Sequence, residues 1–311
     1  MLVSTLTILA LQAISLAAGE LATLESNRPA VRVHATGAEA IRLGRRDNSD
    51  DHLDMNAGRG YKIGIIDSGV DYLHPDLGGC FGSGCKIAYG YDFVGDAYTG
   101  MNAPKPDADP MDECNGHGTH VAGIIGANSA LAPGVAPGAT LGAYRVFGCQ
   151  GSVTVEVLIA AMRRAAADGM DIINVSIGTG RFFTNFPDAV AAEEIARSGV
   201  VVVASAGNDG TFHMTGISSP AVAPDVISVA SINPTKVAAF YFTHANVDEK
   251  LYYLSNNHIS SFTSVFSSFG PTDNATNIKP DVAADGMQIF STYPRKLGSY
   301  AILTGTSMAA P

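Results

Sequence analysis

From Tyr61 onward, short apolar runs alternate with longer segments that have helical spacing. Runs such as KIGIID, TLGAYRVF, MDIINVSIG and VVVVASAG are nearly continuously apolar, whereas HVAGIIGA, VTVEVLIAAMRRAAADG and FPDAVAAEEIARSG space their apolar residues as helices do. Strands that are apolar on both sides and alternate with helices are typical of a parallel sheet covered on both faces. The pattern therefore predicts an α/β fold with a mostly parallel central sheet and helices on both faces.

This alternation is lost between Ile232 and Phe266. Aromatic and polar residues mix there without a period, as in FYFTHANVDEKLYYLSNNHIS, which indicates a long surface excursion. Regular signals return in GMQIFSTY and SYAILTG, which we interpret as two strands. The second of these runs directly into TGTSMAAP, residues 304–311.

The first residues, MLVSTLTILALQAISLAAGE, form an apolar segment followed by small residues. We interpret residues 1–18 as a signal peptide, although the usual basic start is missing, and expect a secreted, extracellular protein. A buried helix or a single membrane span is the alternative, but the apolar run is shorter than the roughly 20 residues that a span requires. Residues 19–60 are polar and mixed, and read as a shortened pro-region or linker before the folded domain, residues 61–311.

The composition of the chain limits its possible binding partners but does not indicate an activity. The chain has 29 acidic and 19 basic residues, a formal net charge of −10 and no Lys/Arg-rich run. Nucleic acids and anionic membranes carry negative charge and bind basic surfaces. We therefore expect neither nucleic-acid binding nor stable membrane association.

Four cysteines allow three disulfide pairings: Cys80, Cys85, Cys114 and Cys149. A secreted protein meets an oxidising compartment, where disulfides form. The close spacing in CFGSGC favours Cys80 with Cys85, which leaves Cys114 with Cys149. Metal ligation is the weaker alternative, because a structural zinc site usually has two tight pairs of ligands and only one is present.

Three short motifs carry residues with catalytic chemistry. Asp67 follows the apolar run KIGII, His117 lies between two glycines in NGHGTHVAG, and Ser307 lies among small residues in GTSMAAP. A serine is a weak nucleophile unless a base takes its proton and a carboxylate orients that base. Taken singly, each has a structural alternative, since an Asp after a strand is often a turn residue or a helix cap. HGTH lacks the spacing and the glutamate of a zinc-binding helix, so we expect His120 to be a packed, hydrogen-bonded residue.

The stretches IGIIDSGVDYLHPDL, NGHGTHVAGIIGA and GTSMAAP resemble the three active-site motifs of the subtilisin-like serine proteases, the subtilases. Their order along the chain, Asp, His, Ser, is that of subtilisin. The resemblance implies the three-layer subtilisin-like fold and an endopeptidase. It also implies that Ser307 is the nucleophile, that His117 is the general base and acid, and that Asp67 orients His117.

Further roles are implied by the resemblance alone. Asn208, in VVVVASAGNDG, matches the asparagine of the oxyanion hole. The segment Ser176, Ile177 and Gly178 matches the edge along which an extended peptide binds, and Ala204, Ser205, Ala206 and Gly207 match one wall of the primary specificity pocket. We expect a monomer that acts on protein or peptide substrates and needs no cofactor for its chemistry. The sequence leaves metal sites, structural calcium included, undetermined.

Several features depart from the family pattern. The stretch 19–60 is too short for the family's domain-sized propeptide. The excursion after Ile232 stands where larger secreted members, which GGCFGSGCKIAYGYDFVGD resembles, carry a protease-associated domain, but it has only the length of a remnant. In the family GTSMAAP opens a long core helix, so we expect a catalytic domain that is incomplete at its C-terminus.

Two alternatives to an active peptidase follow. The first is a non-catalytic subtilase remnant or fragment that retains the motifs but cannot position Ser307. The second is a nucleotide-binding protein of the Rossmann type, which is disfavoured because the loop after KIGIID lacks the G-x-G-x-x-G fingerprint.

Overall fold

The computed structural model describes residues 54, 56–180, 182–211, 216–233, 236–241, 250–255, 262–273 and 277–311. For residues 236–241 and 250–255 only the backbone path is described. Contacts between Cα atoms divide the chain into Met1–Val31 and Arg32–Pro311, and all described residues belong to the second unit. The predicted signal peptide, residues 1–18, and nearly all of the predicted pro-region lie outside the described residues.

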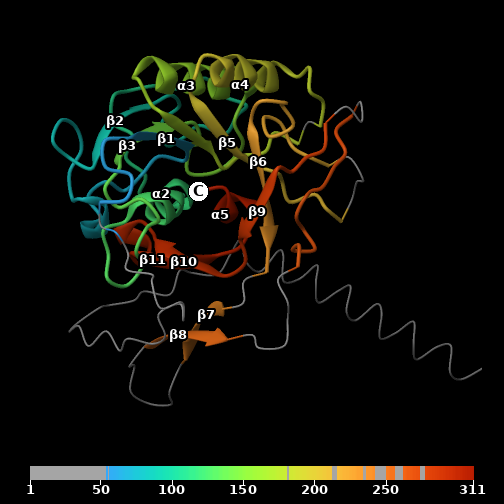
Figure 1. Cartoon of the computed structure of the whole chain (residues 1–311). Coiled ribbons are helices and arrows are strands. Elements are labelled where there is room, and N and C mark those ends of the chain that lie inside the picture. Colours follow the sequence, from blue (N-terminus) through green and yellow to red (C-terminus); the bar gives the residue numbers. More distant parts are fainter. Residues whose placement is uncertain are drawn as a thin grey trace, which may run out of the picture. The chain divides into compact units, whose positions relative to one another are not determined.

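A seven-stranded sheet runs through the described part of the chain (Figure 1). Its order is β2-β3-β1-β4-β5-β6-β9, and every neighbouring pair is parallel. The strands are β1 (Lys62–Asp67), β2 (Ile87–Asp92), β3 (Thr140–Arg145), β4 (Ile172–Val175), β5 (Val201–Ser205), β6 (Ile227–Ile232) and β9 (Val282–Asp285). The predicted parallel sheet is confirmed.

Helices cover both faces of this sheet. One face packs against α3 (Val155–Ala167) and α4 (Pro187–Arg197), and the other against α2 (His117–Gly126) and the short α5 (Thr306–Ala309) (Figure 1). Successive side chains of a strand point to opposite faces. Within β1, Ile66 belongs to the cluster beneath α3 and α4, whereas Ile65 belongs to the cluster with α2. The continuous apolar run of this strand is thus explained by burial on both sides.

Two antiparallel hairpins accompany the sheet. The strands β10 (Ile289–Thr292) and β11 (Tyr300–Leu303) flank the 3-10 turn Arg295–Leu297, and β11 leads into α5 as predicted. The strands β7 (Lys236–Tyr241) and β8 (Lys250–Ser255) form the second hairpin. This hairpin corrects the expectation of an irregular excursion after Ile232. Its runs KVAAFY and KLYYLS are rich in aromatic and aliphatic residues, which favour strands even where no alternation is visible.

Three of the seven parallel strands are not predicted by the sequence pattern. β2 contains a glycine and pairs with β3 through a shift in register between Ile87 and Tyr89. β6, ISVASI, has two serines between its apolar residues, and β9 has only the four residues VAAD. Such short or interrupted runs lack the apolar signal that marks β1. β2 pairs with β3 and β6 with β5, both of which have continuous apolar runs, and β9 adds to β6 at the edge.

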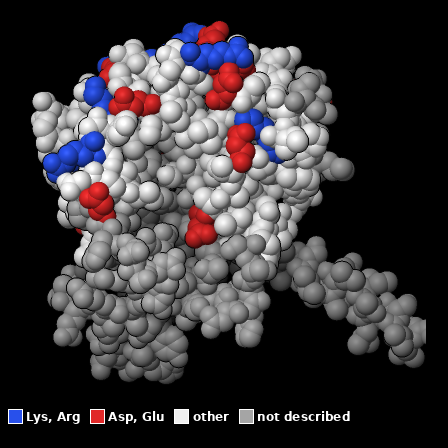
Figure 2. Space-filling view, viewed as in Figure 1, with Lys and Arg blue, Asp and Glu red and all other residues white. Residues whose placement is uncertain are grey.

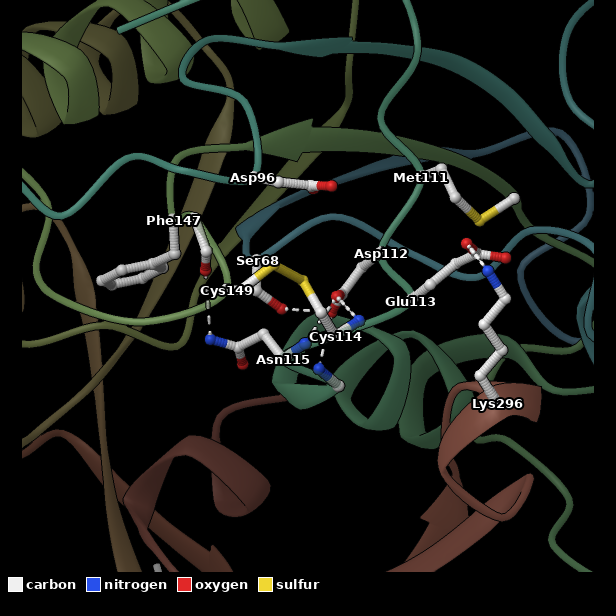
Figure 3. Close-up of a disulfide and its surroundings, with 12 residues drawn as sticks. Ser68, Asp96, Met111, Asp112, Glu113, Cys114, Asn115, Phe147, Cys149 and Lys296 are labelled. Carbon is white, nitrogen blue, oxygen red and sulfur yellow. Dashed lines mark hydrogen bonds and ion pairs between the residues drawn. A yellow bond between two sulfur atoms is a disulfide. The ribbon is translucent and has the colours of Figure 1, made fainter. Parts of the chain in front are cut away.

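Both predicted disulfides are present. Cys80 and Cys85 are joined with their Cα atoms 5.6 Å apart, and Cys114 and Cys149 with theirs 5.2 Å apart. The second disulfide links the loop that precedes α2 to the loop that follows β3 (Figure 3).

Charged side chains of both signs are interspersed on the face seen in Figure 2, and those of α3 and α4 form ion pairs such as Arg163 with Glu194. No basic patch of a single sign appears among the described residues on this face. None of the helices in the described ranges has the length and apolar character needed to cross a bilayer.

Candidate active site

The three predicted catalytic residues lie at the ends of three different elements. Asp67 is the last residue of β1, His117 is the first residue of α2, and Ser307 lies in the first turn of α5. Met308 of α5 and Val121 of α2 belong to one buried cluster. The helices that carry His117 and Ser307 are therefore neighbours on one face of the sheet. His117 lies near the carboxyl end of β1.

His117 and Asp67 form a close pair across 50 residues of sequence. His117 Nδ1 lies 2.8 Å from Asp67 Oδ1 and 2.9 Å from Oδ2. Asp67 is buried, and the Ser68 N–H donates to its Oδ1 at 2.7 Å. Because a carboxylate accepts hydrogen bonds, Nδ1 of His117 carries the proton and Nε2 of the neutral ring is unprotonated. That tautomer leaves Nε2 as the atom able to take a proton.

The charges around His117 raise its pKa. Burial acts in the opposite direction and lowers the pKa, but the charge of Asp67, its hydrogen bond and the charge of Asp112 together outweigh it. About a third of the side chain remains exposed, at 33%. A raised pKa means that His117 holds an abstracted proton more firmly than an ordinary histidine.

The glycines on either side of His117 are required by close contacts. Gly116 has φ 95°, which an L side chain rarely adopts, and a Cβ there would collide with the Tyr293 ring. A Cβ on Gly118 would collide with the carbonyl oxygen of Gly69 and lie 3.0 Å from Asp67 Cβ. Gly118 thus allows the start of α2 to approach the end of β1, and Gly116 allows it to lie against the Tyr293 ring.

Ser307 is bonded to the residue that follows β4. Its Oγ donates to the Ser176 carbonyl at 3.0 Å, and Ser176 Oγ donates to the Ser307 carbonyl at 2.9 Å. Asn174 Nδ2 in turn donates to Ser176 Oγ at 2.9 Å. Ser307 and His117 are both described, and no hydrogen bond joins them, so their predicted contact stays a prediction.

Asn208, just after β5, is oriented by the residue before Ser307. Its Oδ1 accepts hydrogen bonds from Thr306 N at 3.0 Å and from Thr306 Oγ1 at 2.9 Å. With the amide oxygen fixed in this way, the assignment of the amide group is determined, and Nδ2 is the atom left to donate. Asn208 is exposed, and its predicted role in the oxyanion hole stays a prediction.

The predicted substrate-binding residues occupy the ends of β4 and β5. Ser176 and Ile177 are buried at the end of β4, and Ala204, Ser205 and Ala206 are buried at the end of β5. Gly178 and Gly207 both face Ser218: a Cβ would lie 2.9 Å from Ser218 Cβ at Gly178 and 2.5 Å from its Oγ at Gly207. Their roles toward substrate stay predictions.

Three polar residues around the site are missing from the sequence analysis. They are Ser68, which follows Asp67; Asp112, which precedes the NGHG motif; and Thr306, which precedes Ser307. Ser68 and Thr306 lie within the quoted motifs, next to Asp67 and Ser307, and Asp112 lies outside them. Their contacts reach across the fold and are visible only in the structure.

His120 is a packed residue, as predicted. It is fully buried, and its Nε2 lies 3.0 Å from the carbonyl oxygen of Ile289 and 3.2 Å from that of Ala301. Burial, with the neighbouring charge of His117, lowers its pKa to about 3. Asp96, Cys114 and Cys149 bring potential metal-ligand atoms together. The two sulfurs are joined in the disulfide, so they offer no thiolate to a metal.

Comparisons with known proteins find relatives of the chain. A profile of the Subtilase family matches residues 58–311. The chain is 43% identical over 174 residues to the minor extracellular protease Vpr of Bacillus subtilis (strain 168), a match that covers 56% of the chain and 21% of Vpr. It is 33% identical over 258 residues to Subtilisin DY of Bacillus licheniformis, covering 82% of the chain and 74% of that protein. A solved structure described as a cold adapted subtilisin-like serine proteinase aligns with a TM-score of 0.59 at 27% identity, covering 87% of the chain and 79% of that structure. The chain thus spans a minor part of Vpr but most of Subtilisin DY.

Proposed function

The chain belongs to the subtilase family, and we propose that it is a serine endopeptidase that hydrolyses peptide bonds in protein substrates through Asp67, His117 and Ser307. The observation that carries the proposal is the Asp67–His117 pair, which folding assembles across 50 residues. Asp67 ends β1, and His117 begins a helix that neighbours the one bearing Ser307. A buried carboxylate, an imidazole and a hydroxyl in this order are the parts of an acyl-transfer site.

The first step is attack by Ser307 Oγ on the carbonyl carbon of the scissile bond. The hydroxyl proton passes to His117 Nε2 as the new C–O bond forms. Asp67 keeps its hydrogen bond to Nδ1 and stabilises the imidazolium, without itself taking a proton. In the structure this hydroxyl donates to Ser176, so the reaction requires it to turn toward His117 when substrate binds.

The negative charge that develops on the carbonyl oxygen needs donors. Asn208 Nδ2 supplies one, since Thr306 holds the other end of the amide. The Ser307 N–H, at the start of α5, supplies a second, because the first N–H groups of a helix have no partner within it. Fixed donors of this kind stabilise the tetrahedral intermediate without reorganising during the reaction.

Collapse of the intermediate breaks the C–N bond. His117 gives its Nε2 proton to the leaving amine, and the acyl group remains on Ser307 as an ester. Water then attacks the ester with His117 again as base, and the acid product leaves with Ser307 restored. We propose that the peptide lies along Ser176, Ile177 and Gly178 as an added strand, with Ala204, Ser205, Ala206 and Gly207 forming one wall of the pocket for the residue before the scissile bond.

We also infer that the protein acts outside the cell. Two disulfides among the described residues suit an oxidising compartment, and the relative Vpr is named an extracellular protease. The apolar start of the chain supports the same inference. N-terminal sequencing of protein collected from the culture medium tests it, and retention of residues 1–18 in secreted protein would contradict the signal peptide.

Labelling with a fluorophosphonate tests the catalytic proposal directly, because the probe reacts only with an activated serine. We expect labelling of the folded protein and turnover of an unstructured protein substrate, both abolished by Ser307→Ala. Lack of labelling in a protein that circular dichroism shows to be folded would instead identify a non-catalytic member of the family.

A further inference from the structure

Asp112, five residues before His117, has a buried carboxylate with four hydrogen bonds. Oδ1 accepts from the backbone N–H groups of Cys114 at 3.0 Å and Asn115 at 2.8 Å. Oδ2 accepts from the N–H of Gly116 at 2.6 Å and from Ser68 Oγ at 2.8 Å. Figure 3 shows these bonds converging on one side chain. Three of the four donors belong to the loop that ends at His117.

The Ser68 hydroxyl extends this network to the rest of the site. It accepts from the N–H of Gly118 at 3.0 Å while it donates to Asp112. The Ser68 N–H is the donor to Asp67 Oδ1 at 2.7 Å. One residue thus ties the end of β1, the first turn of α2 and the carboxylate of Asp112 together.

We propose that Asp112 is a positioning residue for His117, which fixes the backbone on the N-terminal side of the imidazole and supplies a second buried negative charge behind it, in addition to Asp67. The proposal rests on the proposed function of His117 as the base. Asp112 is 0% exposed, and the described residues include no ion pair to it. Its charge is therefore balanced by N–H and O–H donors, and it remains available to stabilise the imidazolium.

The other charged groups around this loop form their ion pairs with residues other than Asp112. Arg145 of β3 pairs with Asp92 at 3.3 Å and Asp96 at 2.7 Å, and its Nη1 donates to the Met111 carbonyl at 2.8 Å. Glu113 pairs with Lys296 at the surface.

Two further groups come from neighbouring elements. Tyr293 donates from its hydroxyl to the Asn115 carbonyl at 2.9 Å, and burial together with the charge of Asp112 raises its pKa. His120 lies on the same helix as His117 and stays neutral because burial lowers its pKa to about 3. Of these groups, only Asp67 and Asp112 place negative charge that raises the pKa of His117.

The test is Asp112→Asn, which removes the charge and sets an NH₂ group against two donors. We expect kcat/KM on its alkaline plateau to fall about 10- to 100-fold, by analogy with the loss seen when the outer partners that orient metal-binding histidines are removed. The acidic limb of the pH profile should also move to lower pH, because His117 loses a charge that favours its protonated form. A merely structural role would lower the plateau and leave the limb in place.

A titration that needs no activity separates this inference from the proposed function. His117 is followed by NMR in the Ser307→Ala background, with and without Asp112→Asn, and its pKa should fall in the double variant. Asp168→Asn is the charge-matched control, because Asp168 caps α3 on the opposite face of the sheet. An unchanged His117 pKa in the folded Asp112 variant, or an equal shift in the control, overturns the proposal.

Ser68→Ala supplies an independent test if Asp112→Asn does not fold. It keeps the charge of Asp112 and removes the hydroxyl that links it to Gly118. We expect a lower plateau in kcat/KM with the acidic limb unmoved. An unchanged plateau would show that the link positions nothing and would overturn the positioning part of the proposal.

Discussion

The loop before His117 and the turn before Ser307 present the two reacting groups in different ways. The loop, residues 112–116, is held by a buried carboxylate, by the Cys114–Cys149 disulfide and by the Tyr293 hydroxyl. In the described part of the chain, Thr306 and Ser307 make only neutral hydrogen bonds, including those of Thr306 with Asn208 and Gly207 and of Ser307 with Ser176. No disulfide reaches the turn in the described ranges.

The difference follows the charge that each side must stabilise. His117 becomes positive during the reaction, so buried carboxylates beside it are favourable. The substrate oxygen near Asn208 becomes negative, and a carboxylate there would oppose it, whereas neutral amide and N–H donors stabilise it. The base is therefore surrounded by acidic groups and the nucleophile by neutral ones.

The largest expected effect comes from Asp67→Asn. The amide can present its NH₂ to Nδ1 and favour the wrong tautomer of His117, so kcat should fall about 10⁴-fold. Steady-state kinetics on a peptide substrate measures this, with Ser307→Ala giving the background rate. A loss below tenfold would show that the function of His117 does not depend on the buried carboxylate of Asp67.

Removing each disulfide in turn tests whether the Cys114–Cys149 link matters to the loop before His117. Replacing Cys114 and Cys149 by Ala opens a loop with a sequence separation of 35, against a separation of 5 for Cys80 and Cys85. Loop entropy predicts losses in the free energy of unfolding of roughly 4 and roughly 2 kcal/mol. Denaturant unfolding in the Ser307→Ala background, which prevents self-digestion, compares the two double variants.

Fluorophosphonate labelling of the same two double variants with Ser307 intact shows where each disulfide acts. We expect slower labelling only without Cys114–Cys149, because that disulfide adjoins the His117 loop. Equal labelling rates would mean that the link stabilises the fold without positioning the base.

On the nucleophile side, Asn208→Ala removes one donor to the oxyanion. We expect kcat to fall about 10²- to 10³-fold with KM little changed, because the interaction forms only as charge develops. Thr306→Val, which removes the hydroxyl bond to Oδ1 but keeps the backbone bond, should have a smaller effect in the same direction. A Thr306 effect equal to that of Asn208 would indicate that the turn itself had moved.

The smallest effect is the contribution of His117 to stability. Its pKa is raised above the ordinary histidine value of about 6.5, so the contribution is fully present below that pH and is lost as pH rises through the folded-state pKa. In Ser307→Ala the free energy of unfolding should therefore decline over this window, and Asp67→Asn should abolish most of the decline. In the active protein kcat/KM should rise over the same window, since neutral His117 is the base.

The sequence determined the parts of the molecule whose signals are local. Continuous apolar runs identify β1, β3, β4 and β5, because burial on both faces of a parallel sheet requires them. The close spacing of Cys80 and Cys85 identified one disulfide and, by remainder, the other. The two glycines beside His117 are visible in the sequence, and Gly118 lies where the Gly69 carbonyl leaves no room for a side chain.

Other features were decided only by the tertiary structure. Nothing in its neighbourhood distinguishes Asp112 from any loop aspartate, and its bond to Ser68 spans 44 residues. The bond from Ser307 to Ser176 spans 131 residues, and that from Thr306 to Asn208 spans 98. The strands β2 and β6 likewise form beside the stronger strands β3 and β5, and β9 adds to β6 at the edge of the sheet. The spacing of apolar residues and the residue types that favour turns can be recognised from neighbouring residues in the sequence. Hydrogen bonds between distant residues depend on where the packed sheet and helices bring them together.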